Sequence, residues 1–272
     1  MKYESPWLND ELRILSDAAD RFFRKELLPH HPQWLEDGVV ARDAWFKAGA
    51  AGLLCAGIPE QYGGGGGDFR HETVITEAQL SLGLGAFGTQ VHSVIVAPYI
   101  LTFGTEEQRK RWLPRLATGE LVGAIAMTEP GTGSDLQAVK STAIRDRDEY
   151  VINGAKTYIT NGQTANFIVV VAKTDPNLGG KGISLLIVET EHVQGFQRGR
   201  NLDKIGLKAA DTSELFFADV RVPMENLLGG ETGKGFVQLM QKLPQERLNI
   251  AQSAVVAMER AIKITTEFVK GF

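Results

Sequence analysis

The sequence predicts an α+β protein with several domains: an all-α part, an all-β part built as an antiparallel sandwich or barrel, and the first helix of a bundle. Three observations lead to this. Helical periodicity fills the chain up to about residue 119, short β-prone runs between turns follow from residue 122, and one long unbroken helical pattern closes the chain. We expect the three parts to span residues 1–120, 121–231 and 232–272.

The first part has apolar residues at three- and four-residue steps after a Ser5-Pro6 start, which is typical of an amphipathic helix. Further helices are expected at 41–51, 71–82, 91–103 and 105–117. In the last of these, Thr105 is expected to cap the helix, and the two glutamates that follow suit its positive end.

The middle part is predicted to be β-structure. Its β-prone runs are 122–127, 141–145, 150–152, 157–160, 167–173, 183–189 and 214–222. Asn153-Gly154 is a strong signal for a two-residue hairpin turn. Because turns are frequent and no helices intervene, the pattern favours an antiparallel sandwich or small barrel over a parallel nucleotide-binding sheet.

The last part follows a glycine-rich joint at 229–235 and is predicted to be a helix from Pro244 to Lys270. Its apolar residues form two stripes, led by Leu248 and Ile250, and a helix that is apolar on two sides belongs inside a bundle. The chain ends at Phe272 without a further helix, so we expect a truncated domain or one completed by another chain.

Composition excludes several classes of function. The 272 residues carry a net charge of −4 and no long basic run, so nucleic-acid binding is not expected. The most apolar stretch, 82–103, is interrupted by Gln90, His92 and Pro98, which argues against a membrane span.

A single cysteine, Cys55, rules out an internal disulfide and is expected to be a small core residue. Residues 1–10 have the pattern of neither a secretory signal nor a transit peptide, which predicts a cytoplasmic protein. The histidines show no metal-ligand spacing, and no metal site is expected. They are His30, His31, His71, His92 and His192.

Two glycine-rich segments invite a comparison with phosphate-binding loops. The run at 63–67 has no following Lys-Ser/Thr and no strand before it, so we expect a mobile loop between helices. The segment MTEPGTGSD, residues 127–135, lies where a strand should end. Its glycines and hydroxyls can present backbone N–H groups and Ser134 to a flat polar ring or a phosphate, but from the residues alone an ordinary turn is the simpler interpretation.

Five motifs in order make the chain resemble the acyl-CoA dehydrogenase family. They are MTEPGTGSD at 127–135, TYITNG at 157–162, KIGLKAADTSELFF at 204–217, VRVPMENLLG at 220–229 and LPQERL at 243–248. IPEQYGGGGGD at 58–68 and FGTEEQRKRWLPRLATGE at 103–120 agree with the same family. The resemblance covers nearly the whole chain and implies a helical domain, a β domain and a four-helix bundle that is incomplete here.

The resemblance implies FAD as the cofactor. The flavin-binding residues it assigns are Ile125, Met127, Thr128, Gly133, Ser134, Tyr158, Ile159 and Thr160. Ser134 would also touch the coenzyme A tail. Many relatives have Trp where this chain has Tyr158, and either ring can stack on a flavin. From the residues alone, Tyr158 is a half-buried strand aromatic.

The resemblance also implies that Glu246 is the catalytic base, because LPQERL is similar to the long-chain type, in which the base lies at this helix. It further assigns Pro244, Gln245 and Arg247 to substrate binding, while Val94, Val96 and Ile100 lie on the helix that lines the acyl pocket of relatives. From the residues alone, Glu246 two positions after Pro244 is an ordinary helix start, and Arg247 is equally compatible with a structural ion pair.

The function implied is FAD-dependent α,β-dehydrogenation of a fatty acyl-CoA thioester to the trans-2-enoyl-CoA, in fatty acid β-oxidation. The implied partners are an acyl-CoA substrate, electron-transfer flavoprotein as the electron acceptor, and three further copies in a homotetramer. The implied location is the bacterial cytoplasm, or the mitochondrial matrix in a eukaryote. The alternative is an inactive truncated fragment that binds flavin or a partner.

Overall fold

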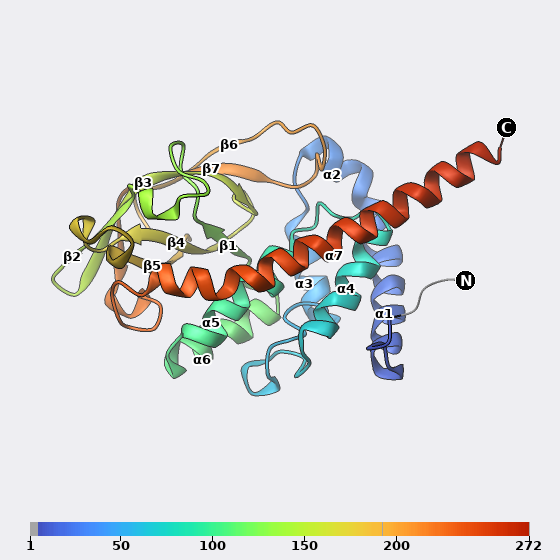
Figure 1. Ribbon diagram of the computed structural model, residues 1–272, viewed down its shortest axis with the longest axis horizontal. Helices are drawn as coiled ribbons and strands as arrows, with labels where there is room; N and C mark the ends of the chain where they lie inside the picture. Colours follow the sequence, from blue (N-terminus) through green and yellow to red (C-terminus); the bar gives the residue numbers. More distant parts are fainter. Residues whose placement is uncertain (1–4, 192, 272) are drawn as a thin grey trace.

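The computed structural model describes residues 5–191 and 193–271. A β-sheet lies at one end of the molecule and most of the helices lie at the other, while α7 (Gly235–Val269) runs along both (Figure 1). The predicted succession of an all-α part, an all-β part and a final helix is confirmed. Residues 1–4 and His192 lie outside the described residues. The first belong to the segment considered for a targeting sequence, and His192 is one of the histidines considered as metal ligands.

The helices before residue 120 lie close to where the sequence predicts them. They are α1 (Asp10–Phe22), α2 (His31–Asp37), α3 (Arg42–Ala50), α4 (Phe69–Ser81), α5 (Ala97–Phe103) and α6 (Glu106–Ala117). A π-helical segment, Gln90–Val96, leads directly into α5 and accounts for the first half of the helix predicted at 91–103. The sequence pattern does not predict α2. Of the helices described, none is long and apolar enough to cross a membrane.

The predicted cap of α6 is confirmed. The Thr105 hydroxyl accepts the Gln108 N–H at 3.3 Å, and the Gln108 side chain accepts the Thr105 N–H at 3.0 Å. This reciprocal pair satisfies two donors that a helix start leaves free.

The glycine run before α4 packs closely on the chain that precedes it. The N–H groups of Gly65 and Gly67 donate to the carbonyls of Cys55 and Ala56 at 3.3 and 2.9 Å. A Cβ on Gly64 would lie only 2.2 Å from the Ile58 carbonyl oxygen, so this close approach requires glycine. The predicted loop between helices is present, and its mobility stays a prediction.

The middle of the chain forms seven described strands in one sheet. They are β1 (Gly123–Ala126), β2 (Thr142–Asp146), β3 (Glu149–Thr160), β4 (Phe167–Lys173), β5 (Ile183–Glu189), β6 (Phe196–Asn201) and β7 (Thr212–Pro223). The bounds of β4 and β5 coincide with the prediction. The sequence pattern misses β6, because its side chains are mostly exposed and show no apolar alternation.

The sheet has the order β1-β4-β2-β3-β7-β6, with β5 paired to β4. Most pairs are antiparallel, as predicted, but two pairs are parallel: β1 with β4 from Gly123↔Phe167 to Ala126↔Val170, and β2 with β4 at Thr142↔Lys173. The β1–β4 pair is parallel because the β2–β3 hairpin lies between these strands in the chain and returns it to the same end of β1. Such a long connection is what parallel neighbours require.

The hairpin predicted at Asn153-Gly154 is wrong. These residues lie inside β3 at an irregularity in its pairing with β7, and the chain instead turns between Asp146 and Glu149. The Asn153 amide holds the irregularity by exchanging hydrogen bonds with Asp219 at 3.0 and 2.9 Å. Gly154 is needed because a Cβ there would lie 2.2 Å from the Ser141 hydroxyl.

The predicted start of the last helix at Pro244 is also wrong. The helix begins nine residues earlier, at Gly235. A Cβ added to Gly235 would lie only 2.8 Å from the backbone of Ser184, so the two segments are in close contact. Pro244 is therefore an internal proline, which has no N–H to donate to the carbonyl four residues before it. Gln238 and Leu239, in the first turns of the helix, are buried against the rest of the molecule. This burial favours a helix here over the turn that the glycines at 229–235 suggest.

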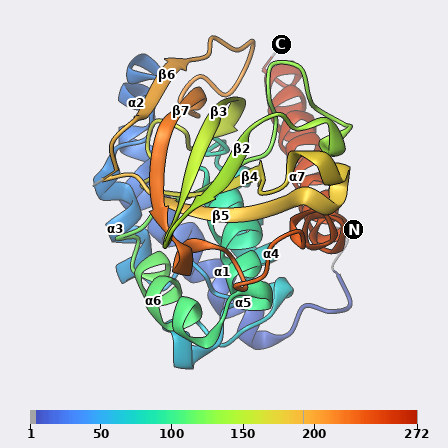
Figure 2. The same ribbon diagram turned by 90° about the vertical axis from the view of Figure 1, so that its left-hand side faces the viewer.

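Helices and sheet share their hydrophobic core. One cluster of buried side chains joins Phe23, Trp45 and Phe87 from the helical part to Ile152 and Leu215 from the sheet. In a view turned by 90°, α5 and α6 lie directly beneath the strands (Figure 2). The division at residues 120 and 231 stays a prediction.

Candidate active site

Two segments that the sequence marks as flavin-binding meet at the end of β1. Thr157 N–H donates to the Thr128 carbonyl at 3.0 Å, and the Thr128 hydroxyl donates back to the Thr157 carbonyl. These reciprocal bonds fix Met127 and Thr128 beside the last residues of β3. Ile125, Met127, Thr128 and Thr160 are each half-buried there.

Tyr158 occupies a strained position in this corner. Its φ is +59°, in the left-handed region that tyrosine rarely adopts, and the pairing of β3 with β7 skips from Lys156 to Ile159. The skip turns the Tyr158 ring outward, where 71% of the residue is exposed, and leaves Ile159 buried. An aromatic ring held exposed by a strained backbone is a feature often associated with a functional site.

A buried ion pair supports the loop from beneath. The Lys156 ammonium is within hydrogen-bond distance of Glu129 Oε1 at 2.9 Å, and it donates to the Met127 and Val171 carbonyls at 3.1 and 2.7 Å. Burial alone would raise the pKa of Glu129, but hydrogen bonds from Ser141 and Lys156 outweigh it and lower that pKa. Sequence reasoning missed this pair because an alternating strand pattern does not distinguish a buried lysine from an exposed one.

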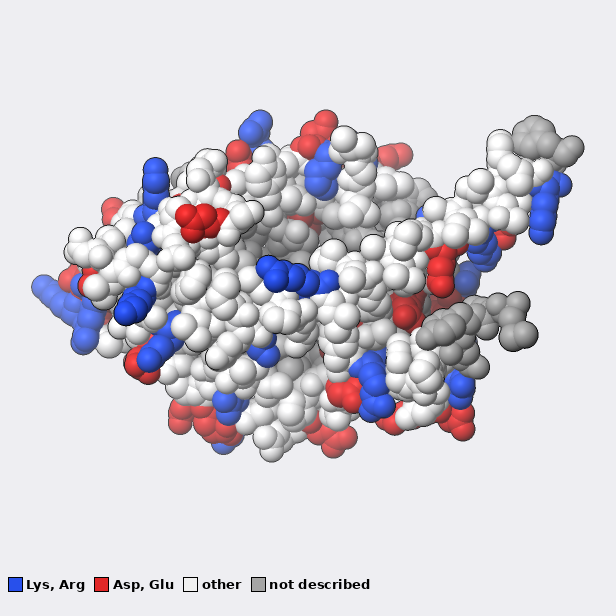
Figure 3. All heavy atoms as spheres, in the orientation of Figure 1, with Lys and Arg blue, Asp and Glu red and all other residues white. Residues whose placement is uncertain are grey.

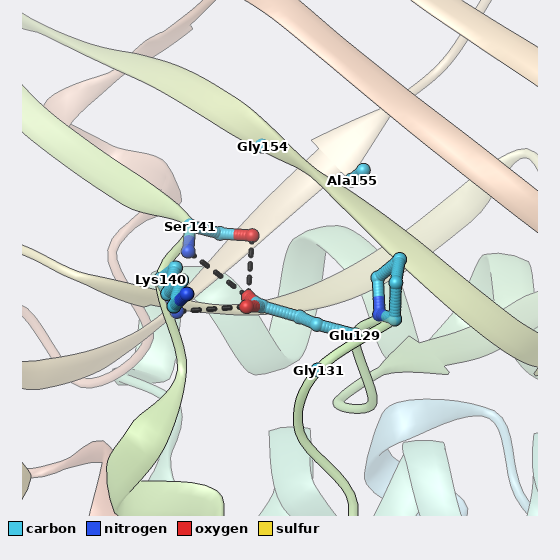
Figure 4. A pocket seen from close by; sticks show the side chains of 7 residues that line it. Glu129, Gly131, Lys140, Ser141, Gly154 and Ala155 are labelled. Carbon is cyan, nitrogen blue, oxygen red and sulfur yellow. Dashed lines mark hydrogen bonds between the residues drawn. The ribbon is translucent and has the colours of Figure 1, made fainter.

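The opposite side of Glu129 faces a cavity of about 300 Å³. Ser141 donates its N–H and its hydroxyl to Glu129 Oε1 at 3.0 and 2.6 Å, and Lys140 N–H donates to Oε2 at 2.7 Å (Figure 4). The Glu129 carboxylate thus holds the two ends of the loop, residues 129–141, together.

Gly133 and Ser134 lie on the exposed part of the same loop. Nothing lies within 4 Å of where a Gly133 Cβ would be, so this stretch of backbone is open to a ligand. Neither residue contacts the β1–β3 corner through a hydrogen bond in the part of the chain that the structure describes.

The second group of predicted site residues lies on α7. Tyr99 of α5 donates its hydroxyl to Glu246 Oε1 at 2.9 Å. Gln245 donates to the Val94 carbonyl at 3.1 Å, whereas Pro244 and Arg247 are exposed. Tyr99 was missed by sequence reasoning, because no local pattern links residues so far apart in the chain.

Glu246 is half-buried, and its environment changes its acidity. Burial raises its pKa above that of an ordinary glutamate, against the opposing effects of the Tyr99 hydrogen bond and the positive charges of Lys242 and Arg247. Glu246 lies about three turns inside α7, so the helix-start interpretation does not apply. A half-buried carboxyl with a raised pKa suits proton transfer.

A smaller cavity of about 150 Å³ lies between α4, α5 and α7, next to this group. Lys242 and Gln245 line it from α7, and Val94 and Pro98 line it from the facing helices. Glu72, which is only 6% exposed, lies at its wall, and burial raises its pKa to about 7. Of the predicted acyl-pocket residues, Val94 lines this cavity, while Val96 and Ile100 pack in the core.

Hydrogen bonds join none of the α7 residues to the β1–β3 corner within residues 5–191 and 193–271. The face drawn in Figure 3 has a hollow between α7 and the strands, with charges of both signs around it. Over the same described ranges, no group of three or more His, Cys, Asp or Glu side chains is arranged to hold a metal ion.

Comparison with known proteins relates the chain to one family. "Acyl-CoA dehydrogenase, N-terminal domain" matches residues 9–120, and "Acyl-CoA dehydrogenase, middle domain" matches residues 124–220. The long-chain specific acyl-CoA dehydrogenase of Sus scrofa, a mitochondrial protein, is 47% identical over 264 residues, which are 96% of this chain and 61% of that protein. The chain thus spans about three fifths of the length of this curated relative.

Solved structures agree with that relationship. An acyl-CoA dehydrogenase from Geobacillus kaustophilus superposes with a TM-score of 0.95 at 48% identity, over 98% of this chain and 70% of that one. An acyl-CoA dehydrogenase from Bacillus anthracis complexed with FAD superposes with a TM-score of 0.90 at 33% identity, over 99% of this chain and 47% of that one.

Proposed function

The chain belongs to the acyl-CoA dehydrogenase family, and we propose that it oxidises a fatty acyl-CoA thioester to the trans-2-enoyl-CoA with FAD as its cofactor. The observation that carries this proposal is Glu246, a half-buried carboxyl with a raised pKa that Tyr99 holds at 2.9 Å. Glu214, in another of the five motifs, is also half-buried, but its hydrogen bond with Arg200 lowers its pKa, whereas burial raises the pKa of Glu246.

The β1–β3 corner fits a flavin. Tyr158 offers an exposed ring whose face can stack on a flat heterocycle, and the half-buried Met127 and Thr128 lie beside it on a strand end fixed by backbone hydrogen bonds. Gly133 leaves its side of the loop open to phosphate or ring atoms. Ile125, Ser134, Ile159 and Thr160 complete the set of residues that we propose to hold the cofactor.

The chemistry divides between cofactor and chain. When bound, FAD supplies the acceptor for the hydride that leaves the β-carbon of the acyl group. Glu246 takes the proton from the α-carbon, which the thioester carbonyl makes acidic. Its raised pKa brings it closer to the acidity of that proton, and its partial burial keeps bulk water from competing for it.

The substrate class is proposed from two sources. Identity to long-chain specific relatives and the LPQERL motif favour a long straight acyl chain. Gln245 and Val94, which line the cavity beside α7, are in place to contact an acyl group that approaches Glu246. Pro244 and Arg247 are exposed on the same turn, and Arg247 can meet phosphate or carbonyl oxygens of coenzyme A.

Fatty acid β-oxidation, electron-transfer flavoprotein as electron acceptor, and a homotetramer follow from the family as further proposals. So does the location, which is the cytoplasm for a bacterial protein and the mitochondrial matrix for a eukaryotic one. The division at 1–120, 121–231 and 232–272 is proposed on the same basis.

A flavin reduction experiment tests the function. The protein, expressed from its own gene and loaded with FAD, should show flavin absorbance that is bleached without oxygen by a long straight-chain acyl-CoA. Glu246→Gln should keep the flavin and abolish the bleaching, because the amide cannot accept the α-proton.

Three outcomes contradict parts of the proposal. Bound flavin that no acyl-CoA bleaches would exclude the dehydrogenase and leave a flavin-binding protein. Unchanged bleaching in Glu246→Gln would mean that the base lies elsewhere. Faster bleaching by short than by long acyl chains would exclude the long-chain preference alone.

A further inference from the structure

Tyr99 and Glu246 form a hydrogen bond that joins α5 to α7. The two residues are 147 positions apart, and the Tyr99 hydroxyl donates to Glu246 Oε1 at 2.9 Å. Tyr99 is completely buried, whereas Glu246 lies at the edge of the interface. The glutamate therefore meets a donor that the protein core holds in place.

Packing fixes the direction of the Tyr99 hydroxyl. The ring belongs to a buried cluster that includes Ile58, Ile100 and Trp112, and its centroid lies 5.9 Å from that of Phe103. A buried tyrosine ring has few rotamers, so the position of its oxygen follows from the position of its backbone. Burial and the nearby Glu246 raise the pKa of Tyr99, so the hydroxyl keeps its proton and remains a donor.

Other groups near the Glu246 carboxylate are less constrained. Lys242 lies one turn earlier on α7, with its ammonium 5.8 Å from the centroid of the Phe103 ring, and Arg247 is exposed. Both cations and the Tyr99 hydrogen bond lower the pKa of Glu246 and so favour its ionised form, whereas burial raises that pKa. Tyr99 is the one group of the three that comes from a different helix and that makes a direct hydrogen bond to Glu246.

We propose that Tyr99 is a positioning residue for Glu246: it holds the carboxylate at the α5–α7 interface, ionised and in one orientation, ready to take the substrate's α-proton. The proposal rests on the function proposed above, in which Glu246 is the base. Tyr99 acts through the glutamate and needs no contact with substrate or cofactor. Its removal should change the acidity and orientation of the base and leave binding of acyl-CoA unchanged.

The test compares Tyr99→Phe with the unchanged protein at its natural length. Phenylalanine keeps the ring in the core and removes only the donor. The first measurement, which needs no activity, is the titration of the Glu246 carboxyl by NMR in protein with ¹³C-labelled glutamate, assigned with Glu246→Gln. We expect the midpoint to rise by about one pH unit, since a hydrogen bond to a charged group is worth at least that much.

The second measurement is the pH profile of acyl-CoA dehydrogenation with FAD bound. The acid limb of kcat/KM should move upward with the Glu246 titration. kcat at the optimum should fall because the base is no longer held, while KM and the bound flavin should be unchanged.

Tyr62→Phe provides a matched control. Tyr62 is also a buried tyrosine, and its hydroxyl donates to a glutamate, Glu106 Oε2, at 2.7 Å, but on α6. Its removal should leave the Glu246 titration and the pH profile unchanged.

The positioning role is overturned if Tyr99→Phe shifts neither the titration nor the acid limb, or if Tyr62→Phe shifts them equally. A shifted Glu246 titration in a protein that never dehydrogenates acyl-CoA would refute the proposed function and the positioning role with it. In that case the hydrogen bond would remain as a structural contact only.

Discussion

Lys156 and Glu129 form a buried ion pair, 2.9 Å between Nζ and Oε1, in which the lysine side chain has no exposed surface. The pair lies beneath the corner where β1 ends, and the same ammonium also binds the Met127 and Val171 carbonyls. One lysine thus connects the loop after β1 to β3 and β4. Its removal tests how far the loop depends on this contact.

Replacement of Lys156 by methionine should destabilise the protein by about 3–5 kcal/mol. The change leaves the Glu129 carboxylate buried without its cation, and an unpaired buried charge strongly destabilises the folded state. Urea unfolding measures the free energy. Lys208→Met removes a surface lysine paired with Asp203 and should change stability much less, because water screens an exposed ion pair. Equal losses in the two variants would show that the buried pair has no special role.

His92 should make the protein less stable as pH falls from 6.5 to about 4. Its Nδ1 accepts the Gly123 N–H at 2.9 Å and its Nε2 faces the Leu116 carbonyl at 3.0 Å, an arrangement that requires a neutral ring. Burial lowers its pKa to about 4, so in this window the unfolded chain binds a proton that the folded protein does not. The stability present above pH 6.5, about 3 kcal/mol, is lost as pH falls through that range.

Unfolding free energies measured between pH 4 and 7 check this pH dependence. His92→Gln removes the titrating group and should flatten the slope. His30→Gln, a change at an exposed histidine, should leave the slope as it is. If the unfolding free energy of His92→Gln depends on pH as steeply as that of the unchanged protein, other groups cause the loss of stability in acid.

Glu72→Gln should stabilise the protein above neutral pH. The carboxyl accepts the Gly57 N–H at 2.9 Å, a bond that the glutamine oxygen can keep. Burial raises the pKa of Glu72 to about 7, so the native state favours the protonated acid, and that contribution disappears as pH rises from 4.5 through 7. We expect a gain of about 1–3 kcal/mol at pH 8 and little change at pH 4.

Thermal or urea unfolding at both pH values distinguishes the outcomes. The exposed Glu60 of the neighbouring loop, changed to Gln, controls for the loss of one negative charge. A Glu72→Gln variant that is less stable at pH 8 would show that the ionised carboxylate has a favourable partner.

Tyr158→Gly should weaken flavin binding while leaving the fold intact. Glycine adopts φ = +59° without strain, which should return about 1 kcal/mol of stability, and the exposed ring contributes little to the core. Flavin affinity should fall because the stacking surface is gone, whereas Tyr158→Phe should retain it. Fluorescence titration with FAD measures the affinity, and equal binding by all three proteins would contradict the assignment of Tyr158.

The sequence by itself determined the succession of helical and β parts, the bounds of β4 and β5, and the Thr105 cap. These follow from local causes: apolar periodicity, β-branched runs and a capping side chain act over a few residues. The motifs also identified the family, whose resemblance selects Glu246 and the flavin-facing residues as candidates. Their roles stay proposals.

Only the tertiary structure decided the features that depend on distant partners. Asn153-Gly154 forms an irregularity instead of a turn because Asp219 and Ser141 lie against it. Lys156 can be buried because it forms an ion pair with Glu129. Glu246 accepts a hydrogen bond from Tyr99, which belongs to another helix. Local propensity amounts to a fraction of a kcal/mol per residue, whereas burial and pairing of such groups amount to several, so the long-range contacts prevail where the two disagree.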